Sequence, residues 1–81
     1  MNVVEFAEYL VKSIVTEPDL IKVSMFEADE DTNILEIIVP ESEMGRVIGK
    51  NGKTSTAIRT LIQAHAAMNN LPKVKINIDS F

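Results

Sequence analysis

Residues 45–54 read Gly-Arg-Val-Ile-Gly-Lys-Asn-Gly-Lys-Thr and contain all three glycines of the chain. The same ten residues hold three of the eight basic side chains, namely Arg46, Lys50 and Lys53. Gly49 and Gly52 bracket two polar residues. Two glycines so spaced let the backbone adopt positive φ and approach another backbone closely, because no Cβ is in the way. This stretch therefore predicts a tight turn.

Residues of helical spacing follow this turn from about Lys53 onward. The first N–H groups of such a helix have no partner within the helix, and together with the helix dipole they favour an anion. Lys50 and Lys53 add positive charge, and Asn51 adds hydrogen-bond donors. The apolar pair Val47-Ile48 suits the floor of a groove. The pattern predicts a turn that contacts phosphate.

The run Val47-Ile48-Gly49-Lys50-Asn51-Gly52, followed by Ile58 on the next helix, resembles the V-I-G-x-x-G signature of KH domains. In that family the GxxG loop clamps the backbone of about four single-stranded nucleotides. The longer run 45–49, with Ala57-Ile58-Arg59-Thr60, is similar to the KhpA-like family of small bacterial RNA-binding proteins with a single KH domain. The resemblance covers nearly the whole chain, so we expect residues 1–81 to form one KH domain.

The residues and the resemblance together predict an RNA site in which backbone N–H groups from Gly49 to Lys53 meet phosphates. Lys50 and Asn51 flank these phosphates. The full predicted set is Gly45, Arg46, Val47, Ile48, Gly49, Lys50, Asn51, Gly52, Lys53, Ile58 and Arg59. Within it, Arg46 and Arg59 add charge, and the apolar floor is formed or supported by Gly45, Val47, Ile48 and Ile58.

The chain departs from the family pattern at one position of this motif. The family usually has an apolar residue three positions after the second glycine, and here that residue is Ser55. This departure bears on how the first turn of the helix packs under the groove.

The net charge of −4 at first argues against a nucleic-acid partner, but the charges are unevenly distributed. Residues 1–43 contain eleven of the twelve acidic residues and only two bases, whereas residues 44–78 contain six bases and no acid. The local potential governs an encounter more than the total charge does. A charge split alone is typical of a solvated surface; its coincidence with the glycine turn favours nucleic acid.

The composition predicts one small soluble domain. A chain of 81 residues buries about three-fifths of its unfolded surface, and 46% hydrophobic residues without a long apolar run argue against disorder and a membrane span. The absence of cysteine excludes disulfides and thiolate metal sites and fits a reducing cytoplasm. Glu5 and Glu8 interrupt the N-terminal segment, so it does not resemble a signal peptide.

Hydrophobic spacing predicts the element order α-β-β-α-α-β. The expected elements are a helix over 3–16, strands over 20–26 and 34–39, a short helix to about 48, a helix from about 53 to 68, and a strand over 74–78. The short connection between the first two strands implies an antiparallel hairpin, and the helix–helix crossover places the last strand parallel to a hairpin strand. This is an α+β fold with a mixed three-stranded sheet and helices on one face, as the resemblance to type II KH domains also implies.

Caps, breakers and inner residues follow from the same pattern. We expect Asn2 to cap the first helix and Ser42 or Glu41 to cap the second. Asn69-Asn70 and Pro72 are expected to end the third helix. The segment Glu17-Pro18-Asp19 ends the first helix. The predicted inner residues are Val3, Phe6, Ala7, Leu10 and Ile14; Ile21, Val23 and Met25; Leu35, Ile37 and Val39; Ile58, Leu61, Ile62, His65 and Met68; and Val74, Ile76 and Ile78.

The sequence contains incomplete matches to three other kinds of site. Asp29-x-Asp31-x-Asn33 begins like an EF-hand loop, but the sixth position is Ile34 instead of glycine and the twelfth is Pro40 instead of glutamate. The run Gly52-Lys53-Thr54 matches the end of a P-loop, but Val47 occupies the position at which a P-loop requires its first glycine. The single histidine, His65, has no cysteine or second histidine to form a zinc site. We interpret the carboxylates as solvated surface and expect no catalytic residues, metal or cofactor.

The sequence therefore favours a non-enzymatic protein that binds single-stranded RNA with low specificity, or an RNA chaperone. The resemblance implies a homodimer, or a heterodimer with a larger KH-containing protein, and no membrane partner. The alternative is a KH-fold module whose main partner is another protein, supported by Ser55 and by the overall acidity.

Overall fold

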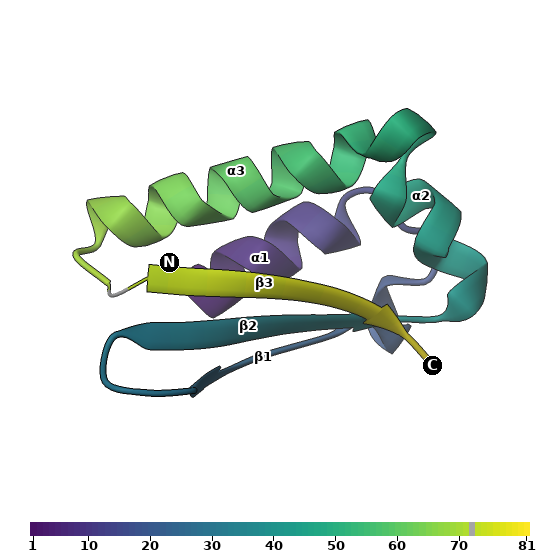
Figure 1. Ribbon diagram of the computed structural model, residues 1–81. Coiled ribbons are helices and arrows are strands. Elements are labelled where there is room, and N and C mark those ends of the chain that lie inside the picture. The colour runs from purple at the N-terminus through teal and green to yellow at the C-terminus, as the bar shows by residue number, and fades with distance from the viewer. Residues whose placement is uncertain (72) are drawn as a thin grey trace.

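The computed structural model describes residues 1–71 and 73–81. Three strands form one layer and the helices cover one face of it (Figure 1). The elements are α1 (Val3–Lys12), β1 (Lys22–Glu27), β2 (Thr32–Val39), α2 (Met44–Ile48), α3 (Lys53–Met68) and β3 (Lys73–Ser80). Short 3₁₀ turns are η1 (Pro18–Leu20), η2 (Glu41–Glu43) and η3 (Lys50–Gly52). The predicted order α-β-β-α-α-β is confirmed.

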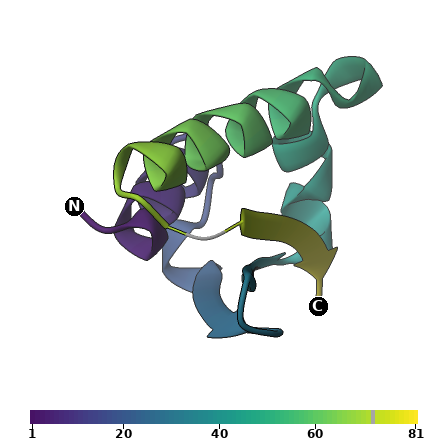
Figure 2. The same ribbon diagram turned by 60° about the vertical axis from the view of Figure 1, so that its left-hand side comes forward.

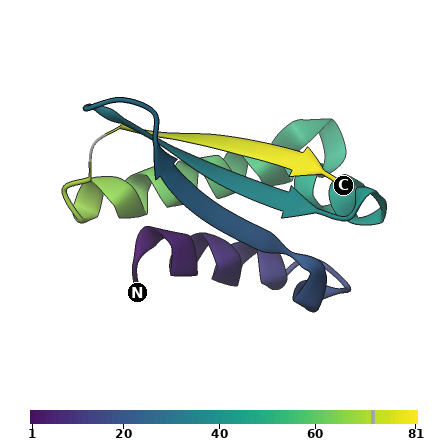
Figure 3. The same ribbon diagram turned by 90° about the horizontal axis from the view of Figure 1, so that it is seen from below.

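The sheet has the order β1-β2-β3, with β2 in the centre. β1 runs antiparallel to β2 and β3 runs parallel to it, so that Met25, Leu35 and Ile76 lie in one row. Seen from the uncovered face of the sheet, the strands lie in front of α3, and α1 lies beside β1 (Figure 3). The mixed three-stranded sheet with helices on one face is as predicted.

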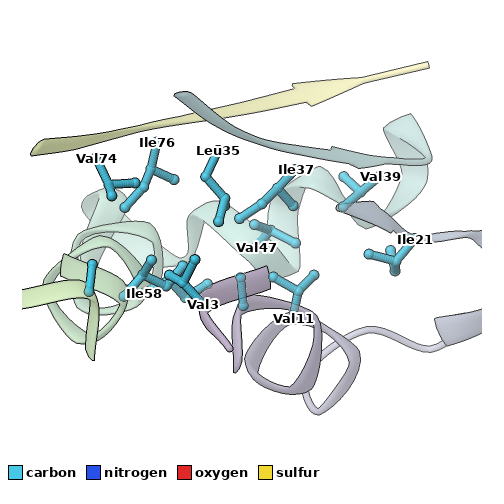
Figure 4. Close-up of a cluster of buried hydrophobic side chains, with 13 residues drawn as sticks. Val3, Val11, Ile21, Leu35, Ile37, Val39, Val47, Ile58, Val74 and Ile76 are labelled. Atoms are coloured by element: carbon cyan, nitrogen blue, oxygen red, sulfur yellow. The ribbon is translucent and has the colours of Figure 1, made fainter. Parts of the chain in front are cut away.

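The core lies between the sheet and the helices. The inner side chains of β2 and β3 point toward α1, α2 and α3 (Figure 4). Every second residue of β2 is buried, which is the period expected of a strand with one covered face. The buried apolar residues are Val3, Ala7, Val11, Ile21, Leu35, Ile37, Val39, Val47, Ile58, Ile62, Ala66, Val74 and Ile76.

Two residues predicted to face inward on α3 do not. Leu61 is 48% exposed and Met68 is 83% exposed. The helix instead packs through the row Ile58, Ile62 and Ala66, spaced four residues apart, which turns Leu61 and Met68 outward. His65 is half-buried between the helices, and its ring stacks on Phe6 with centroids 4.4 Å apart.

Several predicted boundaries move by a few residues. α1 ends at Lys12 rather than 16, and the Ser13 hydroxyl donates to the Tyr9 carbonyl at 2.6 Å. β1 begins two residues later than expected, because residues 18–20 form η1. β2 begins two residues earlier than expected. Asn2 caps α1 as predicted, in a capping box with Glu5. α3 ends at Met68 as expected, while Pro72 lies outside the described residues.

Candidate nucleic-acid interface

The connection between α2 and α3 is a sharp turn at one corner of the molecule, beyond the edge of the sheet (Figures 1 and 2). Gly49 has φ 76°, Asn51 has φ 56° and Gly52 has φ 74°. Three positive φ values within four residues prevent the helix from continuing. The predicted break at the two glycines is confirmed; the positive φ of Asn51 was not predicted, although asparagine tolerates that region better than most residues.

Gly49 is required by space as well as by φ. A Cβ on Gly49 would overlap Thr54 Oγ1 and lie 2.6 Å from Thr54 Cβ. The side chain of Thr54 therefore occupies the volume that any other residue at position 49 would need. Sequence reasoning missed this role of Thr54, because a contact across the turn has no signature in the spacing.

Ser55, the departure from the family pattern, is buried and hydrogen-bonded. It is 5% exposed, and its hydroxyl donates to the Gly52 carbonyl at 3.1 Å. A buried hydroxyl is costly unless it finds a partner, and here the partner belongs to the turn itself. The Ser55 hydroxyl thus links the first helical turn of α3 to the Gly-x-x-Gly turn.

The N-terminus of α3 is electropositive. Gly52 is its N-cap residue, no side chain caps it, and its first turn contains no acidic residue. Such an end presents the positive end of the helix dipole. The predicted row of phosphate-binding N–H groups is only partly free, because the N–H groups of Gly49, Gly52 and Lys53 already donate to backbone carbonyls. Lys50, Asn51 and Lys53 are exposed around it. This arrangement attracts an anion.

The basic side chains differ in whether an acidic side chain forms an ion pair with them. Within residues 1–71 and 73–81, the ion pairs are Lys12 with Glu8 and Arg46 with Glu43, so Lys50, Lys53 and Arg59 keep their charges uncompensated. Arg46 Nε lies 3.5 Å from Glu43 Oε1, although the arginine side chain remains 58% exposed. Arg59 is half-exposed on α3.

The predicted apolar floor divides into two kinds of residue. Val47 and Ile58 are buried in the core, at 0% and 5% exposure, and so support the site from beneath. Gly45 is exposed, and a Cβ built on it meets nothing within 4 Å. Ile48 is half-buried. The accessible surface beside the turn therefore includes Gly45, which has open space where a side chain would be, and part of the Ile48 side chain.

Glu43 is a second residue that sequence reasoning missed, because its acidic side chain is typical of solvated surface. It is only 2% exposed. Its Oε2 accepts hydrogen bonds from Thr16 N at 2.8 Å, Thr16 Oγ1 at 2.9 Å and Glu17 N at 2.7 Å. No local signal marks this contact, since the partners lie 26 and 27 residues earlier.

The start of α2 also differs from the prediction. Neither Ser42 nor Glu41 caps it: Glu43 is the N-cap residue and makes no side-chain cap hydrogen bond. The preceding 3₁₀ turn from Glu41 to Glu43 directs the Glu43 side chain toward the segment after α1 instead.

Competing effects act on the pKa of Glu43. Burial raises the pKa, but the N–H of Glu17, the hydroxyl and N–H of Thr16, and the Arg46 guanidinium all stabilise the carboxylate. The net effect is a pKa below the ordinary value of 4.5. Glu43 is therefore ionised in the folded protein at neutral pH.

The acidic residues of the β1–β2 turn lie far from this site. The turn occupies the end of the molecule opposite the α2–α3 junction (Figure 1). The longest dimension of the molecule is 35 Å, several times the Debye length of about 8 Å at physiological ionic strength. The acidic turn therefore has little effect on the potential at the glycine turn.

The element order and the Gly-x-x-Gly turn between α2 and α3 are those of a KH domain of the type II arrangement. The family described as KhpA/KhpB, KH domain, matches residues 4–78. The chain belongs to this family. In none of the described helices is there an apolar stretch of the length that crossing a membrane requires.

Relatives agree with this assignment, and a solved structure shows the same fold. The RNA-binding protein KhpA of Borreliella burgdorferi is 42% identical over 69 residues, which cover 85% of this chain and 83% of the relative. The RNA-binding protein KhpA of Clostridium perfringens is 39% identical, with 91% and 96% coverage. Era in complex with MgGDPNP and nucleotides 1506–1542 of 16S ribosomal RNA has the same fold, with a TM-score of 0.70 at 20% identity. That match covers 98% of this chain but only 30% of the Era chain.

The turn geometry predicts opposite effects for alanine at two of the glycines. Gly49→Ala forces a Cβ against Thr54 at positive φ, and we expect it to lower the free energy of unfolding by about 2 kcal/mol or more. Gly45→Ala places the same methyl group in open space on a helix and should raise stability by about 0.5–1 kcal/mol. Urea denaturation followed by circular dichroism measures both. Equal stability of the two variants would contradict the packing described for Thr54.

The environment of Glu43 predicts a pH dependence of stability. Because its folded pKa is lowered, the carboxylate contributes stability that is present above its unfolded pKa and lost as the pH falls through the folded value. We expect the difference in unfolding free energy between the wild type and Glu43→Gln to be constant from about pH 7 to about pH 5.5. The difference should then shrink as the pH falls below 4.5. Denaturant titrations at a series of pH values test this, and a difference that grows below pH 4.5 would refute it.

Proposed function

We propose that this protein binds single-stranded RNA through the Gly-x-x-Gly turn and the adjoining surface of α2 and α3, without enzymatic activity. The observation that carries the proposal is the uncapped N-terminus of α3, which opens onto exposed main chain between Gly49 and Gly52. Membership of the KhpA/KhpB family supports it, as do relatives described as RNA-binding proteins.

In the proposed complex, phosphates lie against the main chain from Gly49 to Lys53, at the positive end of the α3 dipole. Lys50 and Asn51 flank these phosphates, and Lys53 and Arg59 add attraction from α3. Bases lie against Gly45 and Ile48, supported from beneath by Val47 and Ile58. Contacts to the phosphate backbone position a nucleic acid but carry no sequence information, so low specificity follows. This suits a general RNA-binding protein or RNA chaperone.

A single domain of this kind binds weakly. If Arg46, Lys50, Lys53 and Arg59 each neutralise one phosphate, the logarithm of the binding constant falls with the logarithm of the salt concentration with a slope of about −3. A second domain on the same RNA raises the effective concentration without any new contact. We therefore propose that the chain acts as a homodimer or pairs with a larger KH-containing protein, and that it works in the cytoplasm.

Charge reversal at the turn tests the site. We expect Lys50→Asp with Asn51→Asp to weaken binding to a short labelled single-stranded RNA by at least tenfold, because two carboxylates would face the phosphates. The salt slope should fall in magnitude by about 0.7, the share of one lysine. Fluorescence anisotropy across a salt series measures both quantities.

The matched control is Lys22→Asp with Ser24→Asp, which changes the net charge equally. Both control residues are exposed on β1, which pairs only with β2. We expect this control to weaken binding only slightly. If the two double variants weaken binding equally while both stay folded, the attraction is general and the proposed site is wrong. If the wild type binds no RNA, the protein-interaction alternative takes precedence.

The oligomer proposal has a separate test. Sedimentation velocity of the wild type should show a mass that rises with concentration from 9.0 kDa toward twice that value. A mass of 9.0 kDa throughout the micromolar range would exclude the homodimer and leave a second KH-containing protein as the proposed partner.

A further inference from the structure

Glu43 joins two segments that are distant in the sequence. Among the described residues it is the one acidic or basic side chain that is buried. Its Oε2 accepts three hydrogen bonds from Thr16 and Glu17, in the segment between α1 and η1. Its own backbone is the N-cap of α2, the helix that ends in the Gly-x-x-Gly turn.

α2 is short and depends on its neighbours for its position. It has five residues, too few to form a stable helix without outside support. Val47 is its one buried side chain and fixes how deeply the helix lies against the core. Met44 is partly buried against the same core, but apolar contacts restrain rotation and tilt weakly, because the hydrophobic effect is non-directional. Glu43 provides a directional contact at the other end.

The turn depends on α2 through the backbone. Gly49 N donates to the Gly45 carbonyl at 3.0 Å, and Gly52 N donates to the Gly49 carbonyl at 3.2 Å. The two hydrogen bonds link α2 to the turn in series, so a change in the tilt of α2 is passed to the main chain that faces the phosphates in the proposed complex.

We propose that Glu43 is a positioning residue for RNA binding: its carboxylate holds α2 against the segment after α1 and thereby keeps the Gly-x-x-Gly turn in the conformation that receives phosphate. The part of this inference that concerns RNA rests on the proposed function. The part that concerns the order of the turn does not.

The two carboxylate oxygens can be tested separately. Glu43→Gln can keep an oxygen acceptor for Thr16 and Glu17 while turning its NH₂ group toward Arg46, where donor faces donor. Glu43→Ala removes both interactions and leaves the N–H groups of Thr16 and Glu17 without their acceptor. The matched control is Glu41→Ala, which removes an exposed glutamate two residues earlier.

The first measurement uses the protein without RNA. Hydrogen exchange of the Gly49 and Gly52 amides should be at least tenfold faster in Glu43→Ala than in the wild type, because the turn opens locally. Exchange of the Leu35 and Ile37 amides in β2 should increase less. Glu43→Gln should stay within about threefold of the wild type, and Glu41→Ala should be unchanged.

The second measurement is RNA affinity, taken at a temperature where every variant is fully folded. We expect Glu43→Ala to bind about tenfold more weakly, Glu43→Gln to recover most of the affinity, and Glu41→Ala to match the wild type. A residue that only stabilised the fold would not change the affinity of molecules that are already folded. Recovery by glutamine and selective exchange at the turn therefore identify a positioning role.

The inference is overturned if folded Glu43→Ala keeps wild-type exchange at Gly49 and Gly52. Should that variant fail to fold, Thr16→Val removes only the hydroxyl donor, and we expect turn exchange a few times faster than in the wild type. Wild-type exchange in folded Thr16→Val would then overturn the inference. If the wild type binds no RNA, the proposed function fails, and exchange at the turn still decides the role of Glu43.

Discussion

The contact between Thr54 and Gly49 governs the geometry of the site, because it decides how α3 leaves α2. Val47 fixes α2 in the core, and the row from Ile58 to Ala66 fixes α3. The chain between these two anchors must reverse within four residues. It does so only because Gly49 lacks a Cβ where Thr54 packs and because Asn51 and Gly52 adopt positive φ. The core therefore determines where the turn lies, and the missing side chain determines its shape.

This geometry explains how an acidic protein can present a site for a polyanion. The helix end, the exposed main chain and the unpaired lysines meet at one corner, while the acidic β1–β2 turn lies at the opposite end (Figure 1). At physiological ionic strength, salt screens the electrostatic effect of the acidic turn on the glycine turn. The net charge of −4 thus affects solubility and long-range encounter more than the contact itself.

The parts of the fold that follow from period-two alternation were predicted correctly. Leu35, Ile37 and Val39 are buried because a strand leaves only one choice of inner face. The inner face of α3 was partly wrong, since helical spacing allows two neighbouring apolar rows. Packing against α1 selected Ile58 and Ile62 and left Leu61 outside. The turn was predicted because its glycines are local. The burial of Glu43 was not, because its partners lie across the fold.

A buried carboxylate in so small a domain requires a reason beyond stability. Replacing a buried ionic group with apolar residues of similar volume is often neutral or stabilising, so burial alone is weak evidence that Glu43 stabilises the fold more than an apolar residue would. An apolar replacement cannot make directional hydrogen bonds. Three hydrogen bonds to one oxygen fix the distance and angle between α2 and the segment after α1. A site that relies on its main chain needs this kind of restraint, because a main chain cannot adjust to a misplaced phosphate as a long side chain can.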